Sequence, residues 1–339
     1  MNIVREYVLV LFLISLSIHS FGQNSYLESG NFYYENENYQ KAIVYFTEYL
    51  NINPRDKDVY LLRAESYAKL NLYEDGISDL NTAIKLDKRN EFLLIMRAML
   101  FFNNDNYVEA INDYSNVLKK NSNNLMALKG RSGCYTALDL YDKAIDDLNK
   151  ALTIDPTYSD AYSELGHIMG IKGDNKKAIE YFTKSIDIDS NNIDDYYFRG
   201  IRFYESDMEK EAIEDFTKAI RLDSYYKTEA YFERGNIYHF LGQYDEAISD
   251  YTKTILLDDS NGEAYYYRAL CYDELNMHTL GFDDYSRATM RNSKNSYKAF
   301  VNMGIINYRL GRDYCKYFRK SCELGGEKGC EYFKKAKCN

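Results

Sequence analysis

A pair of one small and one large residue recurs along this chain every 34 residues. A small residue starts the pattern in eight successive segments, at Gly30, Ala64, Ala98, Ser132, Gly166, Gly200, Gly235 and Ala269. A large residue follows three positions later, at Tyr33, Tyr67, Phe101, Tyr135, Met169, Phe203, Tyr238 and Tyr272. Residues three or four apart share one face of a helix, so each segment is predicted to begin with an amphipathic helix.

A second pattern of the same kind follows in each segment. Its small residues are Ala42, Gly76, Ala110, Ala144, Ala178, Ala212, Ala247 and Gly281. Four positions later come Phe46, Leu80, Tyr114, Leu148, Phe182, Phe216, Tyr251 and Tyr285. Polar turns such as ENENY, NNDNY, KGDN and GQYDE separate the two patterns, which predicts a helical hairpin in every segment. A single hairpin cannot bury its apolar face, so the hairpins must stack on one another.

The predicted boundaries follow from this period. The eight units are 23–56, 57–90, 91–124, 125–158, 159–192, 193–226, 228–261 and 262–295, with one extra residue near Lys227. Residues 296–339 remain as a C-terminal cap, which we expect to begin with a further helix from Ser296 to Leu310.

The segments AYSELG, YFRG, YFERG, YDKAIDDLNKALTIDP and EAIEDFTKAIRLD resemble the tetratricopeptide-repeat family. The resemblance implies an all-α fold, a right-handed α-solenoid of about eight helical hairpins. It also implies a non-enzymatic scaffold that binds a protein or an extended peptide through the concave face of the first helices. The Pro that ends the family's repeat is present only as Pro54 and Pro156, which affects the turns between units and not the fold.

An Arg and an Asp occur together in six of the eight units. The Arg–Asp pairs are Arg63 and Asp79, Arg97 and Asp113, Arg131 and Asp147, Arg199 and Asp215, Arg234 and Asp250, and Arg268 and Asp284. The other two units lack both members and have Ser29 with Tyr45, and Leu165 with Tyr181. We therefore predict a contact between the two helices of one unit; the alternative is two solvated positions that vary together.

The cap contains four of the six cysteines, Cys315, Cys322, Cys330 and Cys338. Folding the segment back at LGGEK places Cys322 opposite Cys330 and Cys315 opposite Cys338, and these two disulfides are predicted among three possible connectivities. A four-thiolate zinc site is the alternative, although the usual CxxC pattern is absent. SCELGGEKGC also resembles the Cys-bridged hairpins of secreted Sel-like repeats. The other cysteines, Cys134 and Cys271, are expected to be core residues.

The family resemblance places positions 2, 5, 9, 12 and 13 of each unit on the concave face. Their aromatic residues are Tyr34, Phe92, Phe102, Tyr197, Tyr204, Phe232, Phe240 and Tyr266. In the last three units their acidic residues are Asp194, Glu205, Glu229, Glu263, Asp273 and Glu274, and no Lys or Arg occupies these positions there. This predicts an acidic, aromatic-lined groove for a basic or neutral peptide or partner helix. The alternative is ordinary packing between units beneath a solvated surface.

Charge and the first residues add the expected location. The formal net charge is −10, so nucleic acid or an anionic membrane is not the expected partner. Residues 1–22 have Arg5 ahead of an apolar run and end in small residues, which is typical of a cleaved signal peptide. No other segment is apolar for the roughly 20 residues that a transmembrane helix needs. We expect an exported protein, periplasmic or extracellular.

Signatures of common enzymes are absent from the sequence. His19, His167, His239 and His278 are far apart, and GxxxxGK[ST], GxGxxG, GxSxG and HExxH do not occur. We therefore expect no catalytic residues, no metal and no cofactor. Two alternatives stay open: a binder of glycans or small molecules, with Tyr197 and Phe232 stacking on rings, and a regulatory subunit of an envelope enzyme.

Overall fold

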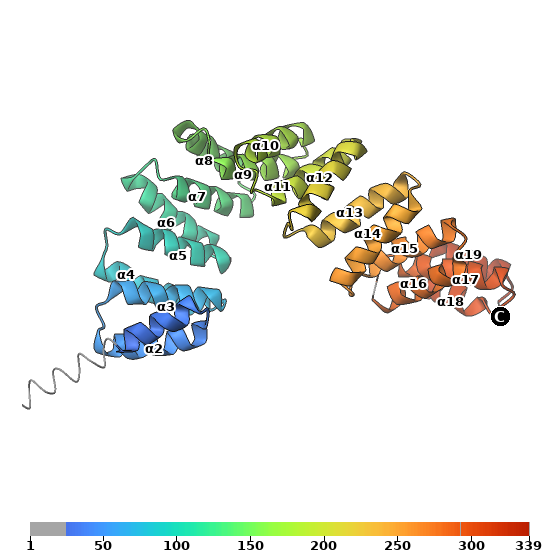
Figure 1. The fold of residues 1–339 in the computed structure, drawn as a ribbon, viewed down its shortest axis with the longest axis horizontal. Helices are drawn as coiled ribbons and strands as arrows, with labels where there is room; N and C mark the ends of the chain where they lie inside the picture. Colours follow the sequence, from blue (N-terminus) through green and yellow to red (C-terminus); the bar gives the residue numbers. More distant parts are fainter. Residues whose placement is uncertain (1–24, 292, 339) are drawn as a thin grey trace, which may run out of the picture. The chain divides into compact units, whose positions relative to one another are not determined.

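The computed structural model describes residues 25–291 and 293–338, and within these ranges the chain is helical apart from short turns, with no strand. The predicted signal peptide, residues 1–22, lies outside the described residues. The chain divides into two compact units, Met1–Glu164 and Leu165–Asn339, which are described separately (Figure 1). Among the helices of the described ranges, none combines the length and apolar character that crossing a bilayer requires.

The first unit is a succession of antiparallel helices in which neighbours in sequence pack together. After a helical segment at 25–35 come α2 (Tyr39–Ile52), α3 (Lys57–Lys69), α4 (Tyr73–Leu86), α5 (Glu91–Asn103), α6 (Tyr107–Lys120), α7 (Leu125–Ala137) and α8 (Tyr141–Ile154). The boundary between the two units falls within α9 (Ser159–Ile171).

The second unit continues the same arrangement. Its helices are α10 (Asn175–Ile188), α11 (Asp194–Tyr204), α12 (Glu209–Arg221), α13 (Lys227–Phe240), α14 (Tyr244–Leu257), α15 (Gly262–Glu274), α16 (His278–Met290), α17 (Ser296–Arg309), α18 (Cys315–Glu323) and α19 (Glu327–Lys335). The predicted paired helices are therefore present in both units, and the all-α fold is confirmed.

Each predicted hairpin turn contains one residue with a positive φ at the same position of the repeat. These residues are Glu37, Asn71, Asp105, Asp139, Gly173, Asp207, Gly242 and Asn276. The amide of the next residue donates a hydrogen bond to the carbonyl of the large residue of the first helix, for example Asn106 N to Phe101 O at 2.8 Å. This is the Schellman arrangement, in which Gly, Asn and Asp accept the left-handed conformation most readily. The polar turns thus end each first helix.

The small residues of the first helices allow close approach to the large residues of the second. A methyl group added at Gly200 of α11 would lie 2.9 Å from the ring of Phe216 on α12, and Phe216 is fully buried. Gly235 faces Tyr251 in the same way, at 3.0 Å. Such interlocking contacts explain why small and large residues recur together, because protein interiors are packed nearly as densely as organic crystals.

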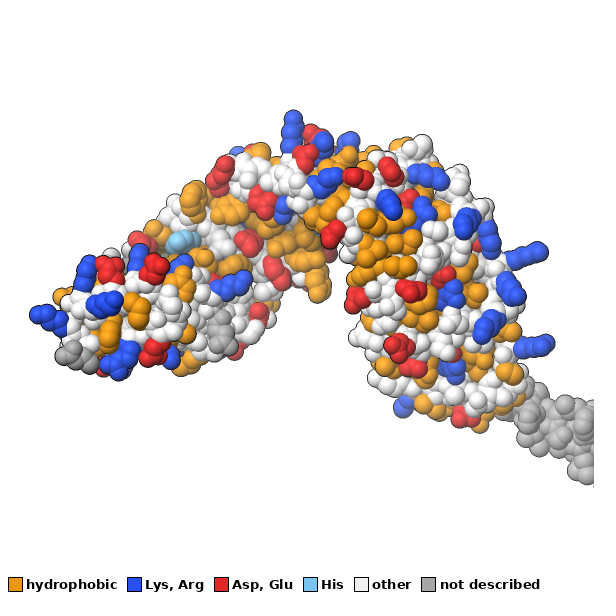
Figure 2. All heavy atoms as spheres, turned by 180° about the vertical axis from the view of Figure 1, so that it is seen from behind, with side chains coloured by type: hydrophobic (Ala, Val, Ile, Leu, Met, Phe, Trp, Pro, Cys, Tyr) orange, Lys and Arg blue, Asp and Glu red, His pale blue; other side chains and the backbone are white. Residues whose placement is uncertain are grey.

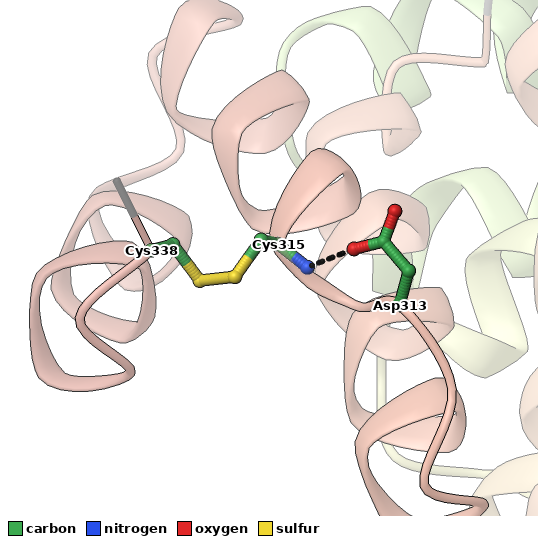
Figure 3. The surroundings of a disulfide bond; sticks show 3 residues. All are labelled: Asp313, Cys315 and Cys338. Carbon is green, nitrogen blue, oxygen red and sulfur yellow. Dashed lines mark hydrogen bonds between the residues drawn. A yellow bond between two sulfur atoms is a disulfide. The ribbon is translucent and has the colours of Figure 1, made fainter.

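Both predicted disulfides are present in the C-terminal cap. Cys315 and Cys338 have Cα atoms 5.4 Å apart, and Cys322 and Cys330 have Cα atoms 4.5 Å apart. The backbone N–H of Cys315 donates to the Asp313 carboxylate at 3.2 Å at the start of α18 (Figure 3). The four thiols of the zinc alternative are therefore used in disulfides, while Cys134 and Cys271 are free and fully buried.

Candidate functional site

Each of the six Arg–Asp pairs joins the two helices of one helical hairpin, as the sequence predicted. Arg199 of α11 donates from Nε and Nη2 to the two carboxylate oxygens of Asp215 on α12, at 2.7 and 2.8 Å. The other five pairs have the same two-pronged geometry. Planar guanidinium groups suit this bidentate contact with a carboxylate.

Each of these Arg residues also has a third partner, which the sequence analysis missed. Its Nη1 donates to a side-chain oxygen on the second helix of the preceding hairpin, such as Thr183 of α10 for Arg199, at 3.0 Å. The equivalent acceptors are Thr47, Asn81, Ser115, Thr217 and Thr252. One Arg side chain thus joins three helices, so these residues hold successive hairpins together rather than bind a ligand.

A pocket lies on the first-helix face of the first unit, between α5, α7 and the start of α9. Its volume is about 380 Å³, and its apolar lining includes Met99 and Phe102 from α5 and Met126 from α7. These three side chains are exposed by 42%, 37% and 53%. Figure 2 shows hydrophobic side chains reaching the surface in this part of the chain. Most of the lining comes from the repeat positions expected to face a partner.

Two glycines of α7 shape this pocket in different ways. A methyl group added at Gly130 would overlap the ring of the buried Tyr114, so that ring occupies the space of the missing side chain. At Gly133 an added methyl would meet only Phe102, at 3.7 Å, an ordinary contact. The pocket therefore has free space beside Gly133, whereas the ring of Tyr114 closes it beside Gly130.

The pocket has a polar edge. Lys129 donates to the Asp160 carboxylate at 2.5 Å, and each side chain keeps more than a third of its surface exposed. The hydrogen bond and charge of Asp160 raise the pKa of Lys129 despite partial burial. Glu164 lines the same pocket. A fixed ion pair beside an apolar cavity can orient a ligand while the cavity takes an apolar side chain.

The aromatic residues predicted for the second unit are largely packed. Tyr197 stacks on Tyr226 with ring centres 4.8 Å apart, and Phe232 contacts the rings of Tyr251 and Tyr267. Tyr266 is 6% exposed and belongs to the core. Tyr204 is half-buried, and Phe240 is 70% exposed. The packing interpretation thus fits Tyr266 best, and Phe240 is the residue most available to a partner.

The predicted acidic residues divide into two kinds. Three accept internal hydrogen bonds: Asp194 from Ser224 and Tyr225, Glu263 from Ser293 and Asn295, and Asp273 from Tyr285 and His278. The other three are exposed, and of these Glu205 pairs with Arg202 at 2.7 Å. Glu229 and Glu274 are exposed, and Glu274 interacts electrostatically with His239.

Glu233 of α13 is a carboxylate that the sequence analysis missed. Burial raises its pKa, and Asn236 donates to it at 3.1 Å while accepting from Tyr251 at 2.9 Å. Glu233 occupies position 6 of its 34-residue repeat. Gly130 and Glu164, which line the pocket described above, occupy position 6 of their own repeats. Position 6 was not among the expected inward positions. Comparing charged residues at that position between units is the signal that could have identified it.

Comparisons with known proteins agree with this fold. Models described as tetratricopeptide repeat match residues 23–56, 58–90, 159–192 and 228–261, and one described as TPR repeat matches residues 135–170. Comparison with curated proteins gave no significant match.

Several solved structures resemble this chain. A tetratricopeptide repeat protein from Parabacteroides merdae aligns with a TM-score of 0.58 at 17% identity, covering 74% of this chain and 98% of that one. The C-terminal part of a TPR repeat-containing protein from Cytophaga hutchinsonii aligns with 0.57 at 23% identity, covering 70% and 98%. The Cut9–Hcn1 hetero-tetramer of APC/C aligns with 0.55 at 18% identity, covering 79% and 52%. At these identities the likeness shows the fold alone. Together with the family models and the hairpins described above, it identifies the chain as a tetratricopeptide-repeat protein.

Proposed function

We propose that this protein is an exported, non-enzymatic scaffold that binds a protein partner through the first-helix face of its repeats. The observation that carries the proposal is the pocket lined by Met99, Phe102 and Met126 beside the Lys129–Asp160 ion pair. A volume of about 380 Å³ lies within the usual range of ligand pockets. Large apolar side chains that enter such cavities dominate the affinity of many protein interfaces.

The partner is an extended peptide segment or a helix with one large apolar anchor side chain. Methionine and glycine suit this task, because a methionine side chain adapts to its ligand and a glycine leaves the backbone accessible. In the second unit, the exposed carboxylates Glu229 and Glu274 favour a partner that is basic or neutral there.

Export is supported by two independent features. Residues 1–22 have the composition of a signal peptide. The two cap disulfides suit an oxidising compartment, since structural disulfides are rare where glutathione keeps thiols reduced.

A pocket-filling substitution tests the proposal. Gly133→Leu places an apolar side chain in the cavity, and the helix should tolerate it because Leu has a higher helix propensity than Gly. The matched control is Asn116→Leu on the exposed face of α6. Affinity purification of wild type and both variants from intact cell envelopes, with bound proteins identified by mass, should recover a partner with wild type and Asn116→Leu and lose it with Gly133→Leu.

Two outcomes would contradict the proposal. Equal recovery with all three proteins would mean that the pocket does not hold the partner. Saturable binding of a glycan or small molecule with no protein recovered would favour the alternative class of ligand.

A further inference from the structure

The charge of the second unit is divided between its repeats and its cap. Residues 165–295 contain 16 Lys and Arg against 25 Asp and Glu. Residues 296–339 contain ten Lys and Arg against four Asp and Glu. The overall charge of −10 therefore conceals a basic cap on an acidic body, and Figure 2 shows several Lys and Arg side chains at this end of the chain.

Several of these cap cations are exposed and not neutralised within the cap. Lys320 pairs with Glu323, and Lys335 pairs with Glu331. Lys328 interacts electrostatically with Glu331. For five other exposed cations no ion pair with a carboxylate occurs among the described residues: Arg309, Arg312, Lys316, Lys334 and Lys337. These charges on a short segment give a local positive potential that an anionic partner would neutralise.

The same segment of the chain also has exposed apolar residues. Tyr308 and Leu310, at the end of α17, are exposed by 63% and 51%. Leu324 between α18 and α19 is exposed by 48%, and Tyr332 of α19 by 37%. Basic residues interspersed with Leu and Tyr are typical of surfaces that lie at a membrane interface, where the apolar groups enter the headgroup layer.

The disulfides give this surface a fixed form. Helices α18 and α19 have nine residues each, fewer than an isolated helix needs to be stable in water. The Cys315–Cys338 and Cys322–Cys330 bonds join their ends and keep the cations on a folded hairpin.

We propose that the cap is a docking surface for a membrane leaflet rich in anionic phospholipids. The phosphates of the headgroups meet the exposed cations of the cap, and Leu324 and Tyr332 contribute apolar contact. The acidic repeats are repelled by the same leaflet, so the cap is the part of the second unit that faces it.

Vesicle co-sedimentation of the full chain tests this proposal, using phosphatidylglycerol mixed with phosphatidylcholine, and phosphatidylcholine alone. The cap variant is Lys316→Glu, Lys328→Glu and Lys334→Glu together. The matched control is Lys119→Glu, Lys150→Glu and Lys176→Glu, three exposed lysines of α6, α8 and α10. Both variants have the same net charge and the same N-terminal segment, so only the position of the change differs.

We expect wild type to bind the anionic vesicles and not the neutral ones. The cap variant should bind at least about tenfold more weakly, and the control should stay within about twofold of wild type, because each basic residue near the surface adds to the attraction. Binding should weaken from low salt to 0.15 M, where the screening length is about 8 Å. If the cap variant does not fold, the triple Lys→Gln substitution at the same three sites should give the same order of affinities.

Three results would overturn the proposal. Equal loss in the cap and control variants would show that total charge alone decides binding. Equal binding to both kinds of vesicle would exclude recognition of anionic headgroups. Self-association without lipid, abolished in the cap variant and accompanied by no vesicle binding, would assign the cap to the acidic repeats of a second copy.

Discussion

His167 is a half-buried titratable residue that takes part in no candidate site. Its ring lies edge-on to Phe182 and Phe198, with ring centres 5.0 and 4.2 Å away. Burial, and secondarily the positive charge of Arg202, lowers its pKa from 6.5 to about 4. The folded protein therefore keeps this imidazole neutral where an unfolded chain would protonate it.

This difference makes stability depend on pH. Between pH 6.5 and about 4 the unfolded state binds a proton at His167 that the folded state does not, so stability falls as pH decreases through this window. The full effect is roughly 3 kcal/mol, since one pKa unit corresponds to about 1.4 kcal/mol. Urea unfolding at several pH values should show that acidification lowers the free energy of unfolding less for His167→Gln than for wild type. Parallel curves for the two proteins would show that His167 does not contribute.

At the scale of elements, the repeated Arg residues connect helices. Arg199 of α11 reaches Asp215 in its own hairpin and Thr183 in the preceding one. Its side chain is 15% exposed and that of Asp215 is 8% exposed. A single substitution would therefore leave a charged partner largely buried and without its counterion, which costs far more than the loss of a surface ion pair.

A double-mutant cycle measures this coupling. We expect Arg199→Leu and Asp215→Leu to be strongly destabilising alone and less than additive together, with a coupling of about 0.5–3 kcal/mol. The matched cycle is the exposed pair Lys227 and Asp223, which should show only about 0.3–0.5 kcal/mol. Chemical denaturation gives all the values. Additive effects at Arg199 and Asp215 would mean that the two side chains do not interact.

The Arg–Asp pairs could be predicted from sequence, whereas their third partners could not. Arg and Asp are present together in six units and lost together in two, which marks a contact without any structure. The third acceptor is Thr, Asn or Ser, residues that occur on many exposed helix surfaces. Their position becomes informative only when the packing of one hairpin on the next is known.

At the scale of the whole molecule, contacts are made mainly between neighbouring helices. Repeat proteins of this kind are stabilised by nearest-neighbour contacts, so damage in one hairpin need not reach distant ones. Phe46 of α2 and Met303 of α17 accordingly belong to separate core clusters.

Local damage should therefore remain local. Phe46→Ala in α2 removes a fully buried ring, which typically costs about 3–5 kcal/mol. Hydrogen exchange should accelerate in α2 and α3 and stay unchanged in α15, α16 and α17. Phe32→Ala, at an exposed site in the helical segment 25–35, is the control and should change neither region. Uniform acceleration along the chain would show that the protein unfolds as one cooperative body.

The sequence by itself determined the paired helices, their turns, the Arg–Asp pairs and the cap disulfides. It could do so because each depends on residues close in sequence or repeated at the same position of every unit. Only the tertiary structure decided which first-helix residues are available to a partner. Tyr266 and Phe240 occupy the same predicted face, yet one is buried and the other exposed. The physical reason is that exposure depends on the neighbouring hairpin, whose packing no single repeat position encodes.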